Sequence, residues 1–174
     1  MVETGIIPEC YVDTNLTETL TGIVCNHQKG CSNVVKQMEE KRSDRFALGV
    51  IDKDKRKVTY VSEFVLVAGN DWLEVLKHKS RHHYLIYIIP AVEGFILRAA
   101  SEMNVSLADY GLPVNLTDLT KVTKQQDSKN DARFKKLFNA IKDSTGLQVL
   151  KNAVDYLRVN QYDVDLEELK RIVL

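Results

Sequence analysis

The chain has 174 residues, enough for one ordinary domain, and its 24 Lys and Arg residues balance 24 Asp and Glu residues. This balance argues against a protein that wraps nucleic acid with its whole surface, and the 44% apolar content argues against disorder. The sequence has no uninterrupted apolar run of membrane-helix length and no signal-peptide pattern at its start. We therefore expect a cytoplasmic protein without membrane association, whose three cysteines stay reduced.

The first part of the chain alternates short apolar segments with helical patterns. We predict strands at 5–8, 21–26 and 46–51, with helices at about 13–20 and 30–41 between them. The nearly continuous apolar run at 46–51 is typical of a strand that is covered on both faces. Strands that alternate with helices predict right-handed βαβ units. The fold class expected is therefore α/β, with a Rossmann-like, mainly parallel sheet flanked by helices.

The middle of the chain continues this sheet. Segments 58–61 and 64–67 are predicted as strands, and so is 84–89, which is rich in β-branched and aromatic residues. A helix is predicted from Pro90 to about 104, because its apolar residues fall on one stripe.

The strand pattern disappears after residue 106. An apolar segment at 116–122 precedes three predicted helices, at about 131–141, 147–159 and 165–173. We therefore expect an α/β domain over residues 1–105 and a helical C-terminal extension over 106–174 that packs on it.

Acidic side chains follow the predicted strands where these end. Glu9 comes directly after the first strand, Asp13 four residues later, and Asp52 and Asp54 after the third. The carboxyl ends of parallel strands share one edge of a sheet, so these acids are expected to converge there. Hard oxygen ligands suit Mg²⁺ or Mn²⁺, which supports phosphoryl transfer or phosphodiester cleavage. The alternative is structural, because Asp-x-Asp is also typical of a solvated turn and Asp13 of a helix cap.

Basic residues gather locally despite the neutral total. Residues 27–57 hold nine Lys or Arg against five acids, 77–83 contain no acid, and 121–136 hold six Lys or Arg against two Asp. A local excess of positive charge attracts phosphates, although such clusters are also common on solvated surfaces. The candidate substrate-binding residues in the first two stretches are His27, Lys29, Lys53, Lys77 and His82.

Other sites are less well supported by the sequence. The pattern Cys25-x-His27-x₃-Cys31 offers three zinc ligands where a structural zinc site needs four, so Cys25 is better explained as a buried strand residue. The glycine motifs of P-loop, dinucleotide-binding and serine-hydrolase sites are absent from the sequence.

The order of elements and acids resembles a known family over roughly residues 3–104. A strand ending at Glu9, then a helix, a strand, a helix and a strand ending at Asp52-x-Asp54 is similar to the Toprim domain of topoisomerases, primases and overcoming-lysogenization-defect nucleases. The resemblance implies that Glu9 acts as acid/base or metal ligand and that Asp52 and Asp54 bind Mg²⁺. Asp13 matches a further acidic position that several Toprim-like nucleases carry.

Two more features bear on this resemblance. Pro90-x-x-Glu93 looks like the helix start of small Toprim-like proteins associated with phage defence, which adds Glu93 to the candidate substrate-binding residues. Cys10-Tyr11 stands where the family commonly has Gly after its Glu.

The resemblance implies a nuclease-like protein that uses Mg²⁺ or Mn²⁺ to process phosphodiesters of nucleic acid, in phage defence. Glu9 would be catalytic, and the metal ligands would be Glu9, Asp13, Asp52 and Asp54. The alternative is a non-catalytic Toprim-like module that engages a partner protein through the same acidic edge.

Overall fold

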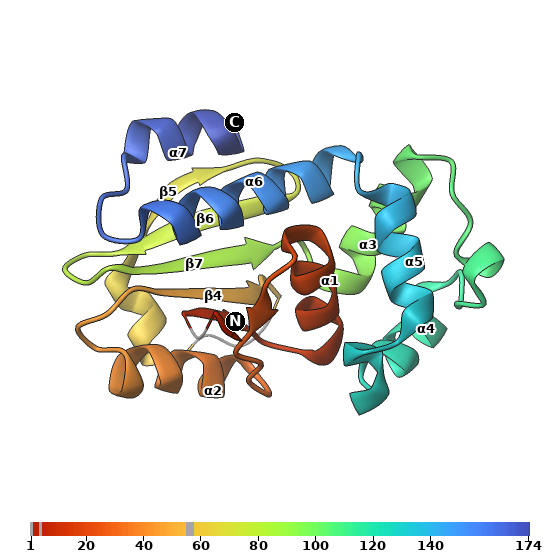
Figure 1. The fold of residues 1–174 in the computed structure, drawn as a ribbon, viewed down its shortest axis with the longest axis horizontal. Helices are drawn as coiled ribbons and strands as arrows, with labels where there is room; N and C mark the ends of the chain where they lie inside the picture. The colour runs from red at the N-terminus through yellow and green to blue at the C-terminus, as the bar shows by residue number, and fades with distance from the viewer. Residues whose placement is uncertain (1, 4, 55–57) are drawn as a thin grey trace.

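The computed structural model describes residues 2–3, 5–54 and 58–174 (Figure 1). The basic residues 55–57, which were counted above, lie outside the described residues. The strands are β1 (Val2–Glu3), β2 (Ile6–Pro8), β3 (Val24–Cys25), β4 (Ala47–Asp52), β5 (Phe64–Gly69), β6 (Leu73–His78) and β7 (His83–Ile88). The helices are α1 (Tyr11–Thr21), α2 (Cys31–Lys36), α3 (Val92–Glu102), α4 (Leu116–Thr123), α5 (Ala132–Ile141), α6 (Thr145–Asn160) and α7 (Leu166–Val173).

A five-stranded mixed sheet in the order β2-β4-β7-β6-β5 forms the centre of the molecule. β2, β4 and β7 are parallel, whereas β6 is antiparallel to both β7 and β5. β1 and β3 form a separate two-stranded parallel pair. The α/β prediction is confirmed, but the expected parallel arrangement holds only for the β2–β4–β7 part of the sheet.

Successive side chains of β4 enter two different hydrophobic clusters, because neighbouring residues of a strand point to opposite faces. Leu48 and Val50 pack into the cluster that contains α1, α3, α5, α6 and α7, and Ile51 packs into the one that contains α2. A Cβ on Gly49 would lie 2.7 Å from a Leu85 methyl and 2.9 Å from a Val34 methyl, so α2 approaches the sheet closely only over a glycine. Coverage of both faces explains the uninterrupted apolar run of this strand.

Several local predictions were wrong. Segment 58–61 is not a strand, because Thr59–Glu63 forms the 3₁₀ turn η2. The strand predicted at 21–26 shrinks to β3, since α1 runs to Thr21 and ends at Gly22, whose φ of 72° is left-handed. Two elements had no prediction: segment 116–122, to which no element was assigned, belongs to α4, and strand β6 was not predicted. In β6 apolar and polar residues alternate only over Leu73-Glu74-Val75, and Leu76-Lys77-His78 breaks the alternation, so the sequence carries only a weak strand pattern there.

The helices after residue 106 share the larger hydrophobic cluster with the sheet. The 3₁₀ turn η4 (Gln126–Lys129) and α5 pack on α1, and α7 packs on β5. In Figure 1 the arrowheads of β4 and β7 point toward the side of the molecule that holds α3, α4 and α5. None of the described helices has both the length and the apolar composition of a membrane span.

Candidate functional site

Acidic side chains meet where β2, β4 and β7 end. Glu9 follows β2, Asp52 is the last residue of β4, and Glu93 lies in the first turn of α3, just after β7. All three line a pocket of about 370 Å³, called the acid pocket below. Two exposed lysines, Lys29 and Lys124, also line it. The parallel strands thus bring together carboxyl groups that are more than forty positions apart in the chain. The strand order predicted this for Glu9 and Asp52, whereas Glu93 was expected only from the family resemblance.

Backbone N–H groups fix the orientation of two of these carboxyl groups. Asp52 N–H donates to Glu9 Oε2 at 3.1 Å, and Val92 N–H donates to Asp52 Oδ1 at 2.9 Å. Val92 opens α3, whose N-cap residue Ala91 has no side-chain acceptor, so the Asp52 carboxyl takes that role. Glu9 and Asp52 are only 5% and 4% exposed, which limits how far either side chain can turn.

The third carboxyl group is held by the C-terminal part of the chain. The Thr123 hydroxyl at the end of α4 donates to Glu93 Oε1. Thr123 is itself buried, and the Ser128 hydroxyl donates to its carbonyl oxygen at 2.9 Å. Residues beyond 106 therefore form one wall of the acid pocket.

Asp13 is a buried acid next to this pocket, in the first turn of α1. It is 0% exposed, and neither of its carboxyl oxygens has a hydrogen-bond partner of ordinary geometry among the described residues. Burial raises the pKa of Asp13 well above its usual range, and the nearby charges of Asp52, Glu9 and Glu93 raise it further. The Cys10 thiol partly offsets this shift in the pKa of Asp13.

Cys10 caps α1 at the edge of the same pocket. Its sulfur accepts a hydrogen bond from Asp13 N–H at 3.4 Å. Burial, followed by the charge of Asp13, raises the pKa of the Cys10 thiol well above its usual value. The thiol is therefore kept neutral and is a poor nucleophile.

Asp54 and Lys53 lie outside the lining of the acid pocket. Both residues are exposed, and Asp54 N–H donates to the Pro90 carbonyl oxygen at 3.1 Å. Lys53 Nζ pairs with Glu74 Oε1 at 2.5 Å, on β6. Of the predicted Asp-x-Asp pair, only Asp52 belongs to the pocket.

Lys77 and His82 lie at the opposite end of the sheet. Because β6 is antiparallel to β7, Lys77 is paired with Tyr84 near the start of β7, while Leu73 is paired with Ile88 at its end. Lys77 Nζ donates to the carbonyl oxygens of His78 and Arg81, and the exposed His82 ring contacts Tyr162 edge-on. The basic stretch 77–83 is therefore not brought to the acid pocket.

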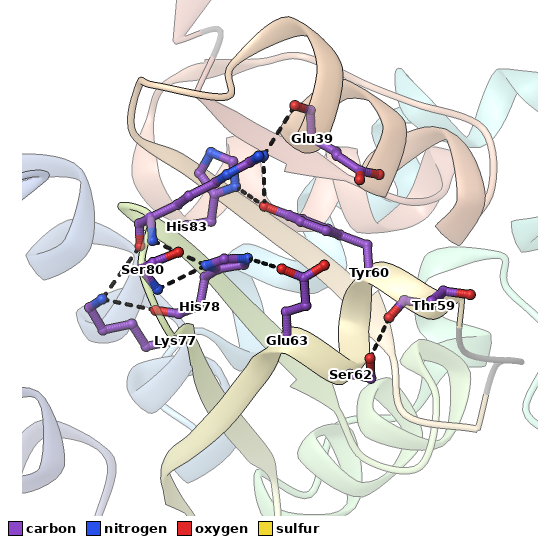
Figure 2. A network of polar contacts seen from close by, with 10 residues as sticks. Glu39, Thr59, Tyr60, Ser62, Glu63, Lys77, His78, Ser80 and His83 are labelled. Atoms are coloured by element: carbon purple, nitrogen blue, oxygen red, sulfur yellow. Dashed lines mark hydrogen bonds and ion pairs between the residues drawn. The ribbon is translucent and has the colours of Figure 1, made fainter.

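A polar network occupies that opposite end (Figure 2). It is called the histidine cluster below, and it joins the buried residues Tyr60, His78 and His83 to the more exposed Glu63 and Arg81. His83 Nε2 donates to the Arg42 carbonyl oxygen at 2.8 Å, so its Nδ1 accepts the Tyr60 hydroxyl at 2.6 Å. His78 Nδ1 accepts the N–H groups of Ser80 and Arg81, so its Nε2 donates to Glu63 at 3.0 Å.

Both histidines of the cluster are neutral in this arrangement. Burial lowers the pKa of His78 and of His83 from the usual value, which agrees with the hydrogen-bond pattern. With His78 at 2% and His83 at 0% exposure, neither ring is accessible to a substrate, although the Glu63 carboxylate is exposed. We interpret the network as structural.

His27 lies near the acid pocket but outside its lining. Its Nδ1 is 2.9 Å from the Thr14 hydroxyl, and its ring stacks on Tyr11. All three cysteines are thiols, and among the described residues no group of three His, Cys, Asp or Glu is arranged to hold a metal ion. The zinc alternative based on Cys25, His27 and Cys31 gains no support.

Five lining residues of the acid pocket were not predicted as site residues: Cys10, Tyr11, Gly30, Thr123 and Lys124. Tyr11 was noted only as a departure from a family pattern, and Lys124 only as part of the basic stretch 121–136. No local pattern predicts that α4 packs beside α3, so the sequence alone does not show that Thr123 and Lys124 lie next to the acidic residues.

Comparison of the chain with protein-family models, with curated proteins and with solved structures finds no match. What the acid pocket binds is therefore inferred from its own residues.

Proposed function

We propose that the acid pocket binds Mg²⁺ or Mn²⁺ together with a phosphate of a nucleic acid, and that the protein is a Toprim-like enzyme that processes phosphodiesters. The observation that carries the proposal is the convergence of Glu9, Asp52 and Glu93 around a pocket whose lining also holds Lys29 and Lys124. Carboxylates attract a divalent cation, and lysines attract the phosphate that accompanies it.

The donor atoms suit such an ion. Buried carboxyl oxygens without partners, as in Asp13, carry an energetic cost that a cation would offset. The described residues contain no ready-made cage of three ligands, but Mg²⁺ commonly takes only one or two protein carboxylates. Water and substrate phosphate oxygens complete its coordination. We propose Glu9 and Asp52 as the principal ligands, with Asp13 as a supporting charge.

The residues of the chain would divide the chemistry between them. Lys29 and Lys124 bind phosphate oxygens at the exposed side of the pocket. Glu9, oriented by the Asp52 N–H group, accepts or returns the proton of the attacking or leaving oxygen. The bound ion would stabilise the charge on the oxygens that attack and leave. The low exposure of Glu9 and Asp52 keeps bulk water from weakening these interactions.

A specific observation favours one alternative, a non-catalytic Toprim-like module that binds a partner protein. Glu9 and Asp52 already accept hydrogen bonds from backbone N–H groups, as structural acids do. In that case the two carboxyl groups only connect β2, β4 and α3, and the exposed lysines meet an acidic surface of the partner.

The test is cleavage of a panel of single- and double-stranded DNA and RNA with Mg²⁺ or Mn²⁺, by the wild type and by Glu9→Gln. Glutamine keeps an oxygen that can accept the Asp52 N–H bond, so the fold is expected to survive. We expect turnover to fall by about 100-fold or more, the usual contribution of a general acid or base, with little change in binding.

A matched control is Asp163→Asn, which removes an exposed carboxylate outside the acid pocket. It should leave turnover unchanged. Activity that persists in Glu9→Gln would contradict the proposed role of Glu9. Absence of any metal-dependent activity across the panel would favour the non-catalytic module.

A further inference from the structure

A second and larger pocket lies beside the acid pocket and shares Tyr11 with it. Its volume is about 690 Å³, and we call it the stacking pocket because the rings of Tyr11 and His27 form one side of its lining. The two ring centroids are 4.5 Å apart and the planes differ by 23°. Residues in and after η4 form the other side, among them Gln126, Lys129 and Asn130.

The His27 ring is fixed in place and uncharged. The Thr14 hydroxyl donates to the Cys10 carbonyl oxygen at 2.9 Å, so at His27 it accepts the Nδ1–H group. Burial, helped by the charge of Lys129, lowers the pKa of His27. Because each ring covers one face of the other, the pair offers the outer faces of its two rings for further stacking.

The opposite side of the stacking pocket is also fixed. The amide of Asn15, a fully buried residue of α1, donates to the carbonyl oxygens of Ser128 and Asp131 at 2.8 and 3.2 Å. The segment that begins with Thr123 and Lys124 in the acid pocket continues directly into this wall. One tethered segment therefore borders both pockets, so no large rearrangement is needed for a ligand to occupy both.

We propose that the stacking pocket binds a nucleobase of a single-stranded nucleic acid whose adjacent phosphate enters the acid pocket. Aromatic rings stack on unpaired bases, and the Gln126 and Asn130 amides offer donors and acceptors for a base edge. Lys129 lines the stacking pocket and Lys124 the acid pocket, so the two lysines would bind phosphates of the nucleic-acid backbone that connects the two pockets. A base inside a duplex is already stacked on both faces, so the substrate class is single-stranded. The phosphate placement rests on the proposed function, whereas the base site does not.

The test is equilibrium binding by fluorescence anisotropy in EDTA, so that it does not depend on metal or on cleavage. The probes are a labelled single-stranded oligonucleotide, its duplex, and an abasic strand of equal length and charge. We expect the wild type to bind the base-bearing strand about 5- to 150-fold more tightly than the abasic strand, the range of one base–aromatic stack.

Two substitutions at Tyr11 make the test specific. Tyr11→Ala should remove the preference for the base-bearing strand, while Tyr11→Phe, which keeps the ring, should retain it. Lys129→Gln should weaken binding of both strands alike, because it removes a phosphate contact and no stacking. Thermal unfolding of each variant checks that the fold is intact.

The outcomes separate this inference from the proposed function. Equal affinity for base-bearing and abasic strands, or no effect of Tyr11→Ala in a folded variant, would overturn the base site. If binding depends on Tyr11 but no metal-dependent cleavage depends on Glu9, the base site stands and the enzymatic proposal fails. If cleavage depends on Glu9 without any base preference, the reverse holds.

Discussion

The two ends of the central sheet both bury polar side chains, but they satisfy them to different degrees. At the end where β2, β4 and β7 finish, Glu9, Asp13 and Asp52 lie together, and the carboxyl oxygens of Asp13 have no hydrogen-bond partner of ordinary geometry among the described residues. At the other end the ring nitrogens of His78 and His83 all have hydrogen-bond partners, and Figure 2 shows these except for the Arg42 carbonyl oxygen at His83. The same strands therefore carry a completed network at one end and an incomplete one at the other.

This difference separates a structural cluster from a candidate site. Buried polar groups with all partners present stabilise one conformation, and removal of one partner costs the desolvation of those left behind. Buried like charges without partners cost stability in the isolated protein, and the cost falls when a ligand of opposite charge binds.

Removal of a ring from the histidine cluster should be strongly destabilising. His83→Leu keeps the volume but leaves the Tyr60 hydroxyl and the Arg42 carbonyl without their bonds to the ring. We expect the free energy of unfolding, measured in urea, to fall by about 2–4 kcal/mol. The neighbouring residue His82 is exposed and supplies the control. His82→Leu should change the free energy of unfolding by less than about 0.5 kcal/mol. If His83→Leu left the free energy of unfolding unchanged, the histidine cluster would not be structural.

Removal of a buried charge at the acid end should instead increase the free energy of unfolding. Asp13→Asn removes a buried charge that Asp52, Glu9 and Glu93 repel. We expect the free energy of unfolding to rise by about 1–3 kcal/mol, and more at alkaline than at acidic pH, because the raised pKa destabilises the fold as pH increases. Thermal unfolding in EDTA measures this change. A loss of stability would mean that Asp13 is structural and that the contrast between the two ends is false.

Low pH should reduce the contribution of the histidine cluster to the stability of the fold. The pKa of His78 and of His83 is lowered by burial, so the unfolded chain takes up protons first as the pH falls through about 6.5. Stability is then complete above that pH and decreases below it, by at most about 1.4 kcal/mol per pH unit for each histidine.

This dependence is best measured in Asp13→Asn, because the raised pKa of Asp13 acts in the opposite direction. Urea unfolding between about pH 7 and pH 5 gives the slope, which His78→Gln should reduce. A slope that His78→Gln leaves unchanged would assign the effect to other groups.

The effect of removing a lysine on oligonucleotide binding should depend on where that lysine lies. Lys29→Gln and Lys124→Gln remove charges from the acid pocket, whereas Lys79→Gln removes an exposed charge just after β6, at the histidine end. We expect the first two to weaken oligonucleotide binding several-fold and to reduce the slope of log affinity against log salt by about one each. Equal losses in all three variants would indicate binding over the whole surface.

The acid pocket could be partly predicted because parallel strands impose a simple rule. An acid directly after one buried strand and an acid at the end of the next must meet at one edge, and Glu9 and Asp52 do. No local sequence pattern indicates that β6 runs antiparallel to β7. Because it does, Lys77 and His82 lie at the end of the sheet opposite to the acid pocket, where they were not expected. Thr123 and Lys124 depend on how α4 packs against α3, a long-range contact that local periodicity does not encode.

The central claim, that the acid pocket is a cation site, is tested most directly by a crystal soaked in Mn²⁺ and measured for anomalous scattering. We predict a manganese ion in this pocket, with an oxygen of Glu9 or Asp52 at about 2.0–2.2 Å. The contradicting result would be a pocket without manganese at saturating concentration, in which Glu9 and Asp52 still accept the N–H groups of Asp52 and Val92.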